Sequence, residues 1–149
     1  MSENIALSDL RPRLIYLVNN INLLTRKSLD ERLKAHQLGG LQYTILTLVR
    51  DREGISSAEL SRRFFVTPQT MNESVTALER RGLITRSESE ANKRILCARI
   101  TDEGRALLAQ CDAIANEVEA EVFGGLPQAD MKTLHRILRD QLHRMMQQV

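Results

Sequence analysis

Three polar side chains near the start of a predicted helix are suited to hydrogen bonding with the edges of DNA bases. Gln69, Thr70 and Asn72 follow the dipeptide Thr67-Pro68. Threonine is a favourable N-cap residue and proline fits the first helical position, so this dipeptide predicts a helix start. Amide side chains match the donor and acceptor of adenine in the major groove, and threonine offers a hydroxyl and a methyl group. The amino end of a helix also suits a phosphate.

The predicted helix, residues 67–81, has one apolar and one polar face. Met71, Val75 and Leu78 share the apolar face and are expected to pack on a preceding short helix, residues 56–64. The opposite face carries Gln69, Asn72, Glu73, Thr76 and Arg80. Taken by themselves, these polar residues are more typical of a solvated helix face. The Thr-Pro start, the preceding capped helix and the hairpin that follows together favour contact with DNA.

A basic hairpin follows this helix. Two short strands are predicted, residues 83–84 and 95–100, the second from its alternating apolar residues. The basic residues of the hairpin are Arg86, Lys93, Arg94 and Arg99. A cationic loop in this place has the right shape to reach a minor groove or the phosphate backbone. Because Glu88 and Glu90 share the loop, a role in solubility is the alternative.

The helix and the hairpin together define the candidate DNA-binding residues. They are Thr67, Gln69, Thr70, Asn72, Glu73, Thr76, Arg86, Lys93 and Arg94.

Composition limits the other classes of function. The 149 residues include 21 Lys and Arg against 19 Asp and Glu, and a net charge of +2 excludes a strongly basic, histone-like coat protein. Aromatic residues make up 3% and tryptophan is absent, which argues against stacking on single strands. The sequence contains no nucleophile–base pair, metal-ligand cluster or glycine-rich phosphate loop. We therefore expect no enzymatic activity, no metal and no cofactor.

The elements that must position these residues follow from hydrophobic periodicity and capping signals. The sequence predicts a single domain, residues 1–149, of the mainly α (α+β winged-helix) class, with six helices and a two-stranded β wing. The expected helices span residues 9–35, 41–51, 56–64, 67–81, 101–122 and 127–147. Residues 41–100 are expected to form a winged helix-turn-helix module.

The helices from the two ends of the chain, within residues 9–35 and 101–147, have large apolar stripes. These stripes exceed what the core of one small domain needs, so we expect them to be buried against a second copy of the chain. Packing within a single chain is the alternative. Two copies would place their recognition helices about one DNA turn apart, roughly 34–36 Å.

The two cysteines, Cys97 and Cys111, lack the spacing of a zinc site or a disulfide scaffold, which fits a reducing cytoplasm. Acidic residues precede any apolar run at the start of the sequence, and no apolar run approaches the roughly 20 residues of a membrane span. We therefore expect a cytoplasmic protein without a secretory signal. Cys97 alternates with apolar neighbours and is expected to point outward on the wing, where redox control is a hypothesis. Cys111 continues an apolar stripe and is expected in the core.

Three stretches of the chain resemble the MarR/SlyA family of winged-helix transcription regulators. They are LQY at residues 41–43, ISSAELSRRFFVTPQTMNESVTALERRGLITR at 55–86 and NKRILCARITDEGRALL at 92–108. By this resemblance Gln69, Thr70 and Asn72 match the base-reading start of the recognition helix. Arg94 matches the wing arginine that enters the minor groove. The family usually has aspartate two residues before that arginine, where this chain has Asn92.

The resemblance implies a homodimer that binds a pseudo-palindromic operator in double-stranded DNA and is released by a small aromatic or anionic ligand. A ligand pocket would lie between the outer helices and the module, near Arg13, Tyr16, Asn20 and Tyr43, although no ligand-binding residue can be assigned. The expected function is a sequence-specific repressor. The alternatives are a winged-helix protein-interaction module without DNA binding and a redox-responsive regulator that uses Cys97. The polar outer face of the recognition helix argues against the interaction module.

Overall fold

The computed structural model describes residues 6–148, which form six α-helices and one small antiparallel sheet. In chain order the elements are α1 (Leu14–Leu33), α2 (Gly40–Asp51), β1 (Ile55–Ser56), α3 (Ser57–Phe64), α4 (Pro68–Arg80), β2 (Ile84–Glu88), β3 (Leu96–Ile100), α5 (Asp102–Phe123) and α6 (Gln128–Met146). Single 3-10 turns, η1 (Leu7–Asp9) and η2 (Lys34–His36), flank α1. The predicted fold class is confirmed.

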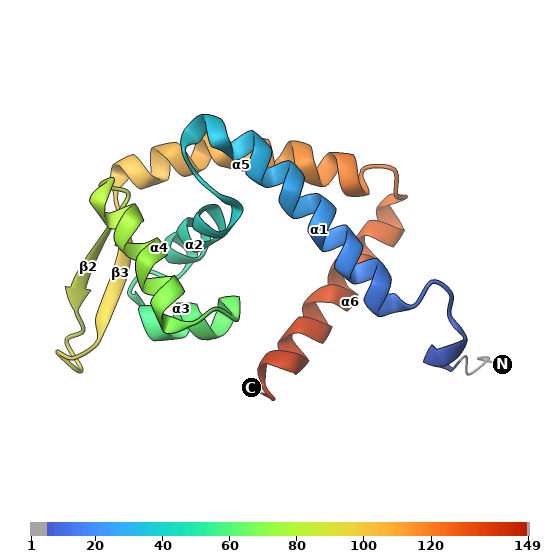
Figure 1. Ribbon diagram of the computed structural model, residues 1–149, viewed down its shortest axis with the longest axis horizontal. Coiled ribbons are helices and arrows are strands. Elements are labelled where there is room, and N and C mark those ends of the chain that lie inside the picture. Colours follow the sequence, from blue (N-terminus) through green and yellow to red (C-terminus); the bar gives the residue numbers. More distant parts are fainter. Residues whose placement is uncertain (1–5, 149) are drawn as a thin grey trace.

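The helices and the sheet divide between two parts of the molecule. Figure 1 shows α2, α3, α4 and the sheet at one end, with α5 running away from them and α6 turning back from its far end. Helix α1 packs against α5. None of the described helices is both long and apolar enough to cross a bilayer.

The apolar face of α4 is buried in the core of the module. Met71, Val75 and Leu78 have no exposed surface, and they belong to one cluster with the equally buried Leu60 of α3. The periodicity that predicted this face is confirmed. With these side chains buried, the rotation of α4 about its axis is fixed and its polar residues must face outward.

Side-chain caps begin three of the helices. The hydroxyl oxygens of Ser56, Thr67 and Thr101 accept hydrogen bonds from backbone N–H groups three residues later, at 3.1, 3.1 and 3.0 Å. Helix α4 ends before Gly82, whose φ of 70° is the left-handed conformation that glycine adopts without strain. These start and stop positions agree with the sequence prediction.

The sheet has one strand more than predicted. Its order is β1-β3-β2, and all neighbours are antiparallel. Strand β1 pairs Ile55 with Ala98 and Ser56 with Cys97. Two residues that lead directly into a helix are too short for an alternating pattern, so only the capping signal of Ser56 was visible in the sequence.

The prediction that the first helix begins at Asp9 is wrong, because α1 begins at Leu14. Arg13, at its N-cap, has extended backbone angles. Pro12 explains the difference, since proline lacks the N–H that a helix interior needs and disfavours helical angles in the residue before it. The apolar periodicity continues across this break and cannot reveal it.

Polar contacts attach the outer helices to the module. The Tyr43 hydroxyl of α2 donates to Asp112 Oδ1 of α5 at 2.7 Å, and Arg50 Nη1 donates to Asp112 Oδ2 at 2.8 Å. Burial, followed by the hydrogen bond to Asp112, raises the pKa of Tyr43 to about 12. Between the outer helices, Arg32 of α1 donates to Glu117 of α5 at 3.2 Å. The position of α5 relative to α2 is thus fixed by paired charges as well as by packing.

Close packing at the start of α5 requires glycine at position 104. A Cβ there would lie 2.1 Å from the carbonyl oxygen of Leu83 and 2.8 Å from Ile100 Cγ1. At Gly125, by contrast, a Cβ would meet no atom within 4 Å.

We expect Gly104→Ala to lower the free energy of unfolding by about 1–3 kcal/mol, because the methyl group overlaps backbone that cannot move away cheaply. Urea unfolding would measure this, with Gly125→Ala as the matched control that keeps stability unchanged within about 0.5 kcal/mol. Equal stability of Gly104→Ala and the wild type would contradict the close packing of α5 on Leu83 and Ile100.

Candidate DNA-binding surface

The amino-terminal half of α4 presents polar side chains to solvent. Gln69, Thr70, Asn72 and Glu73 are exposed, as the sequence predicted. Gln69 Nε2 donates to Glu73 Oε1 at 3.1 Å, one helical turn further on. This contact lies along the helix surface and leaves the amide oxygen of Gln69 open to solvent.

Thr67 has a structural task within the same surface. Its Oγ1 accepts from the backbone N–H of Thr70 at 3.1 Å and lies 3.0 Å from Thr70 Oγ1, to which it donates. Because the hydroxyl accepts from the backbone N–H of Thr70 and donates to its side chain, Thr67 fixes the start of α4 and the position of Thr70. We therefore regard it as a residue that positions the surface, and the sequence prediction of a direct contact stays untested.

The structure places Arg86 differently from the sequence prediction, which grouped it with the cationic loop. Arg86 lies in β2, and its guanidinium turns back onto α4 with only 15% of the side chain exposed. It donates to Asn72 Oδ1 at 3.0 Å and to Thr76 Oγ1 at 3.2 Å. Its Nε and Nη2 also donate to Glu79 Oε2, at 3.1 and 2.7 Å. The hydrogen bond from Arg86 holds the pKa of Glu79 below its usual value.

Glu79 is a residue of this surface that sequence reasoning missed. It lies on α4 seven positions before Arg86, with the Gly82 turn between them. Strand β2 pairs antiparallel with β3 and runs beside α4, which brings the two side chains together. Nothing in the local periodicity marks this pair, because it depends on how the strand returns past the helix.

Lys93 and Arg94 lie in the loop of the wing, at the end of the β2–β3 hairpin that points away from the module (Figure 1). Both are exposed. Asn92 orders the turn that contains them, because its Oδ1 accepts from the Arg94 N–H at 3.0 Å and its backbone oxygen accepts from the Ile95 N–H at 2.9 Å. The asparagine in place of the usual aspartate therefore still holds the backbone that carries Arg94.

Arg99, which was counted with the basic hairpin, and Arg81, which precedes the hairpin, make contacts elsewhere in the chain. Arg81, just after α4, donates to the backbone oxygens of Gln37 and His36 at 2.6 and 3.0 Å. It thereby joins the end of α4 to the segment that follows α1. Arg99 faces Glu53, with Nη1 and Oε2 3.5 Å apart.

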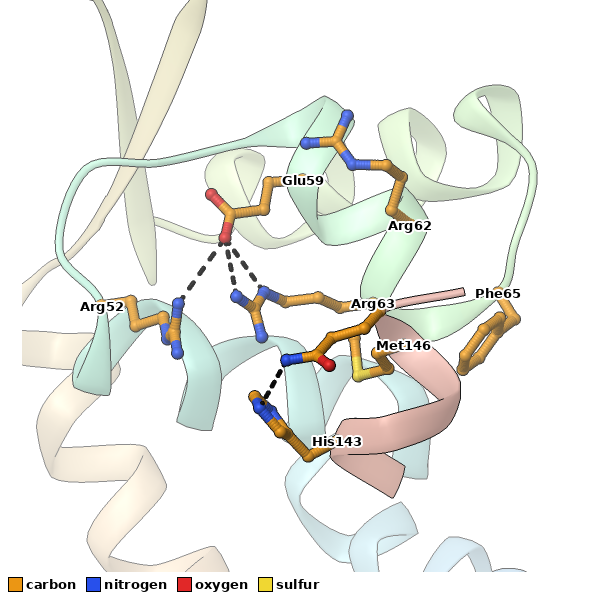
Figure 2. Close-up of a pocket in the computed structure, with 8 residues that line it drawn as sticks. Arg52, Glu59, Arg62, Arg63, Phe65, His143 and Met146 are labelled. Carbon is orange, nitrogen blue, oxygen red and sulfur yellow. Dashed lines mark hydrogen bonds and ion pairs between the residues drawn. The ribbon is translucent and has the colours of Figure 1, made fainter. Parts of the chain in front are cut away.

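The ligand pocket expected near Arg13, Tyr16, Asn20 and Tyr43 stays a prediction. Tyr43 is turned toward α5, and Asn20 Nδ2 donates to the backbone oxygen of Tyr16 at 2.8 Å. A separate cavity of about 560 Å³ lies between α3 and the end of α6 (Figure 2). Its lining consists of Arg52, Glu59, Arg62, Arg63, Phe65, His143, Met146 and Gln147.

This cavity combines positive charge with apolar side chains. Glu59 Oε1 lies 2.9 Å from Arg63 Nη2 and 3.6 Å from Arg52 Nη1. Arg62 points away from that ion-pair cluster, as Figure 2 shows. Phe65 and Met146 supply apolar surface from α3's C-cap and from α6.

The cysteines lie in different environments. Cys97 is partly buried on β3, the central strand, between Ser56 and Ser87 of its neighbours, so it is less exposed than predicted. Cys111 is fully buried in the core, as predicted, and burial raises the pKa of its thiol.

Sequence comparison connects this architecture to characterised regulators. A family profile described as MarR family matches residues 36–95. The chain is 31% identical over 123 residues to the HTH-type transcriptional repressor Rv2887 of Mycobacterium tuberculosis, an alignment that covers 83% of this chain and 88% of that protein. It is 28% identical over 111 residues to the transcriptional regulator HosA of Escherichia coli, covering 72% and 82%.

Solved structures have the same fold. Rv2887 in complex with salicylic acid superposes with a TM-score of 0.72 at 31% identity, covering 91% of this chain and 99% of that one. CouR from Rhodococcus jostii RHA1, bound to p-coumaroyl-CoA, gives 0.79 at 22% identity, covering 92% and 94%. A mutant of E. coli MarR complexed with operator DNA gives 0.75 at 22% identity, covering 87% and 93%. From the match to Rv2887 along most of both chains, together with the family profile over the winged-helix module, this protein belongs to the MarR family of transcriptional regulators.

Proposed function

We propose that this protein is a repressor that binds a pseudo-palindromic site in double-stranded DNA as a homodimer. The observation that carries the proposal is the outward polar face of α4, fixed in rotation by three buried residues and flanked by the exposed basic tip of the wing. The similarity to the transcriptional repressor Rv2887 and to E. coli MarR in complex with operator DNA supports it. The helix has the size and polarity that a major groove accepts.

We assign these residues two roles, namely contact with DNA and positioning of the side chains that make the contact. Gln69, Thr70 and Asn72, with Glu73 next to them, are the groups placed to meet base edges. Lys93 and Arg94 are placed to reach phosphates or a minor groove beside the major-groove site. The residues that hold the surface in shape are Thr67, Thr76, Glu79 and Arg86.

Binding as a dimer would bury the apolar surface of the outer helices. All residues of α6 retain exposed surface in the single chain, including Leu138 at 48%, Leu142 at 53% and Met145 at 60%. On α1, Ile15 is 77% exposed and Leu24 67%. The apolar side chains exposed on α1 and α6, long helices from the two ends of the chain, are more than a soluble monomer normally exposes. We infer that residues 9–35 and 101–147 form the dimer interface, and that residues 41–100 form the DNA-binding module.

We also propose that a small aromatic anion releases the protein from DNA by binding between α3 and α6. The cavity there joins the helix before α4 to a helix of the inferred dimer interface, so a ligand could change their relative position. Arginine side chains beside Phe65 and Met146 suit a carboxylate attached to a ring. The complexes of Rv2887 with salicylic acid and of CouR with p-coumaroyl-CoA support this chemistry.

Footprinting on the promoter region of its own gene and a genome-wide pull-down test the DNA-binding function. We expect a protected palindrome.

Arg94→Ala should weaken binding to all sequences and reduce the slope of log affinity against log salt by about one, because one phosphate contact is lost. Gln69→Ala should cost about 1–3 kcal/mol on the preferred site and less on random DNA. A protein that protects no palindrome would show that the proposed function is wrong, and equal losses on both DNAs would remove base reading by Gln69.

Sedimentation tests the dimer with a matched pair of α6 variants. Leu138→Asp places a charge in the apolar stripe and should give monomers that no longer protect both half-sites. Thr133→Asp, an exposed position on the opposite side of α6, should remain dimeric. A wild-type protein that sediments as a monomer at micromolar concentration would contradict the proposed interface.

Salicylate is the probe for the proposed ligand cavity. We expect it to release wild-type protein from DNA, and we expect Arg62→Ala to raise the concentration needed by about tenfold, the value of one charge-assisted hydrogen bond. Lys132→Ala, an exposed charge removal on α6 outside the cavity, is the control. The same salicylate response in Arg62→Ala and the wild type would place the ligand elsewhere.

A further inference from the structure

The guanidinium of Arg86 determines which way the amide of Asn72 faces. A guanidinium has hydrogen-bond donors only, so the Asn72 atom 3.0 Å from Arg86 Nη1 must be the amide oxygen. The amino group of Asn72 then points away from Arg86. Thr76 Oγ1 likewise accepts from Arg86 Nη2, at 3.2 Å, and keeps its own hydrogen for donation.

Arg86 is itself held in place, so this orientation is fixed before any DNA arrives. Two of its nitrogens donate to the same carboxylate oxygen of Glu79, at 3.1 and 2.7 Å. Only 15% of its side chain is exposed, which strengthens these contacts relative to a surface ion pair. The hydrogen bond from a charged donor also polarises the Asn72 amide and makes its N–H groups better donors.

On the basis of the proposed DNA-binding function, we propose that Arg86 is a specificity-determining positioning residue that makes Asn72 a hydrogen-bond donor toward the base. Adenine needs an acceptor and a donor from an amide, because it presents N7 as an acceptor and its amino group as a donor. Guanine presents two acceptors, N7 and O6. With its oxygen directed at Arg86, Asn72 turns its amino group toward the base, and it therefore favours guanine over adenine, in contrast to the expectation from residue type alone.

The test selects binding sites for the full-length protein from random DNA duplexes and measures the base preference at each position. Asn72→Ala identifies the base pair that Asn72 contacts, since the preference there is lost. We expect the wild type to favour guanine over adenine at that pair by about tenfold, within the range of one good base contact.

Arg86→Lys is the decisive variant because lysine keeps the charge and can still pair with Glu79, but lacks the planar fork that reaches Asn72 as well. We expect its guanine preference at that pair to fall to less than about twofold while preferences elsewhere and the salt dependence remain. If Arg86 had only a structural role, Arg86→Lys would weaken the base preferences at all positions of the site together. Arg105→Lys makes the same change at an arginine of α5 that pairs with Glu53 at 2.7 Å, and should leave every preference intact.

Asn72→Asp gives a second readout that does not depend on how Arg86→Lys folds. Aspartate can still accept from Arg86 but has no N–H to donate, so its guanine preference should be lost. A wild type that prefers adenine at this pair, or an Arg86→Lys or Asn72→Asp protein that keeps the guanine preference, overturns the role of Arg86 and leaves the DNA-binding function standing. A wild type that selects no sequence overturns both.

Discussion

Burial of the apolar face of α4 is the constraint on which the rest of the structure depends. Met71, Val75 and Leu78 are each fully buried, and burying such a side chain stabilises a fold by about 1.5–3 kcal/mol. Rotating the helix to expose any of them would cost that amount, so the polar face has one direction available. The Thr67 cap and the left-handed Gly82 then fix where the helix begins and ends. A surface that recognises a rigid partner needs this fixed geometry before binding.

The same helix is connected to the outer helices by polar contacts at its far end. Arg81 donates to the backbone oxygens of His36 and Gln37, so the end of α4 is attached to the segment after α1. Asp112 of α5 accepts from two residues of α2, Tyr43 and Arg50. In the proposed dimer the distance between two recognition helices would therefore follow the packing of α1 and α5 against their copies. A ligand that moves α3 relative to α6 would act on that distance without touching the DNA-binding surface.

Local signals in the sequence were sufficient to predict most of the fold. A helix start depends on a cap within three residues, and a helix face depends on a repeat of three and four residues, so Thr67 and Met71 could be assigned from their neighbours alone. The errors have other causes. The start of α1 was placed before Pro12 because periodicity alone does not report a missing N–H, and β1 was missed because a two-residue strand exists only through its partner, β3. The first error could have been avoided from Pro12 itself, whereas the second depends on a partner strand about 40 residues further along the chain.

Arg86 shows most clearly why the candidate site could be predicted only in part. Its position in the sequence, on a basic hairpin, suggests an exposed cation, yet the return of β2 past α4 turns the side chain onto Glu79. This changes what another residue offers to a partner, because an amide such as Asn72 can present either its oxygen or its amino group until a neighbour fixes the direction of its oxygen. The residues on the outer face of α4 therefore do not by themselves define which hydrogen-bonding groups this face offers to a partner. Under the proposed DNA-binding function, the strand beside the helix completes the definition, so a substitution in β2 would alter the preferred base while the residues proposed to face the DNA stay the same.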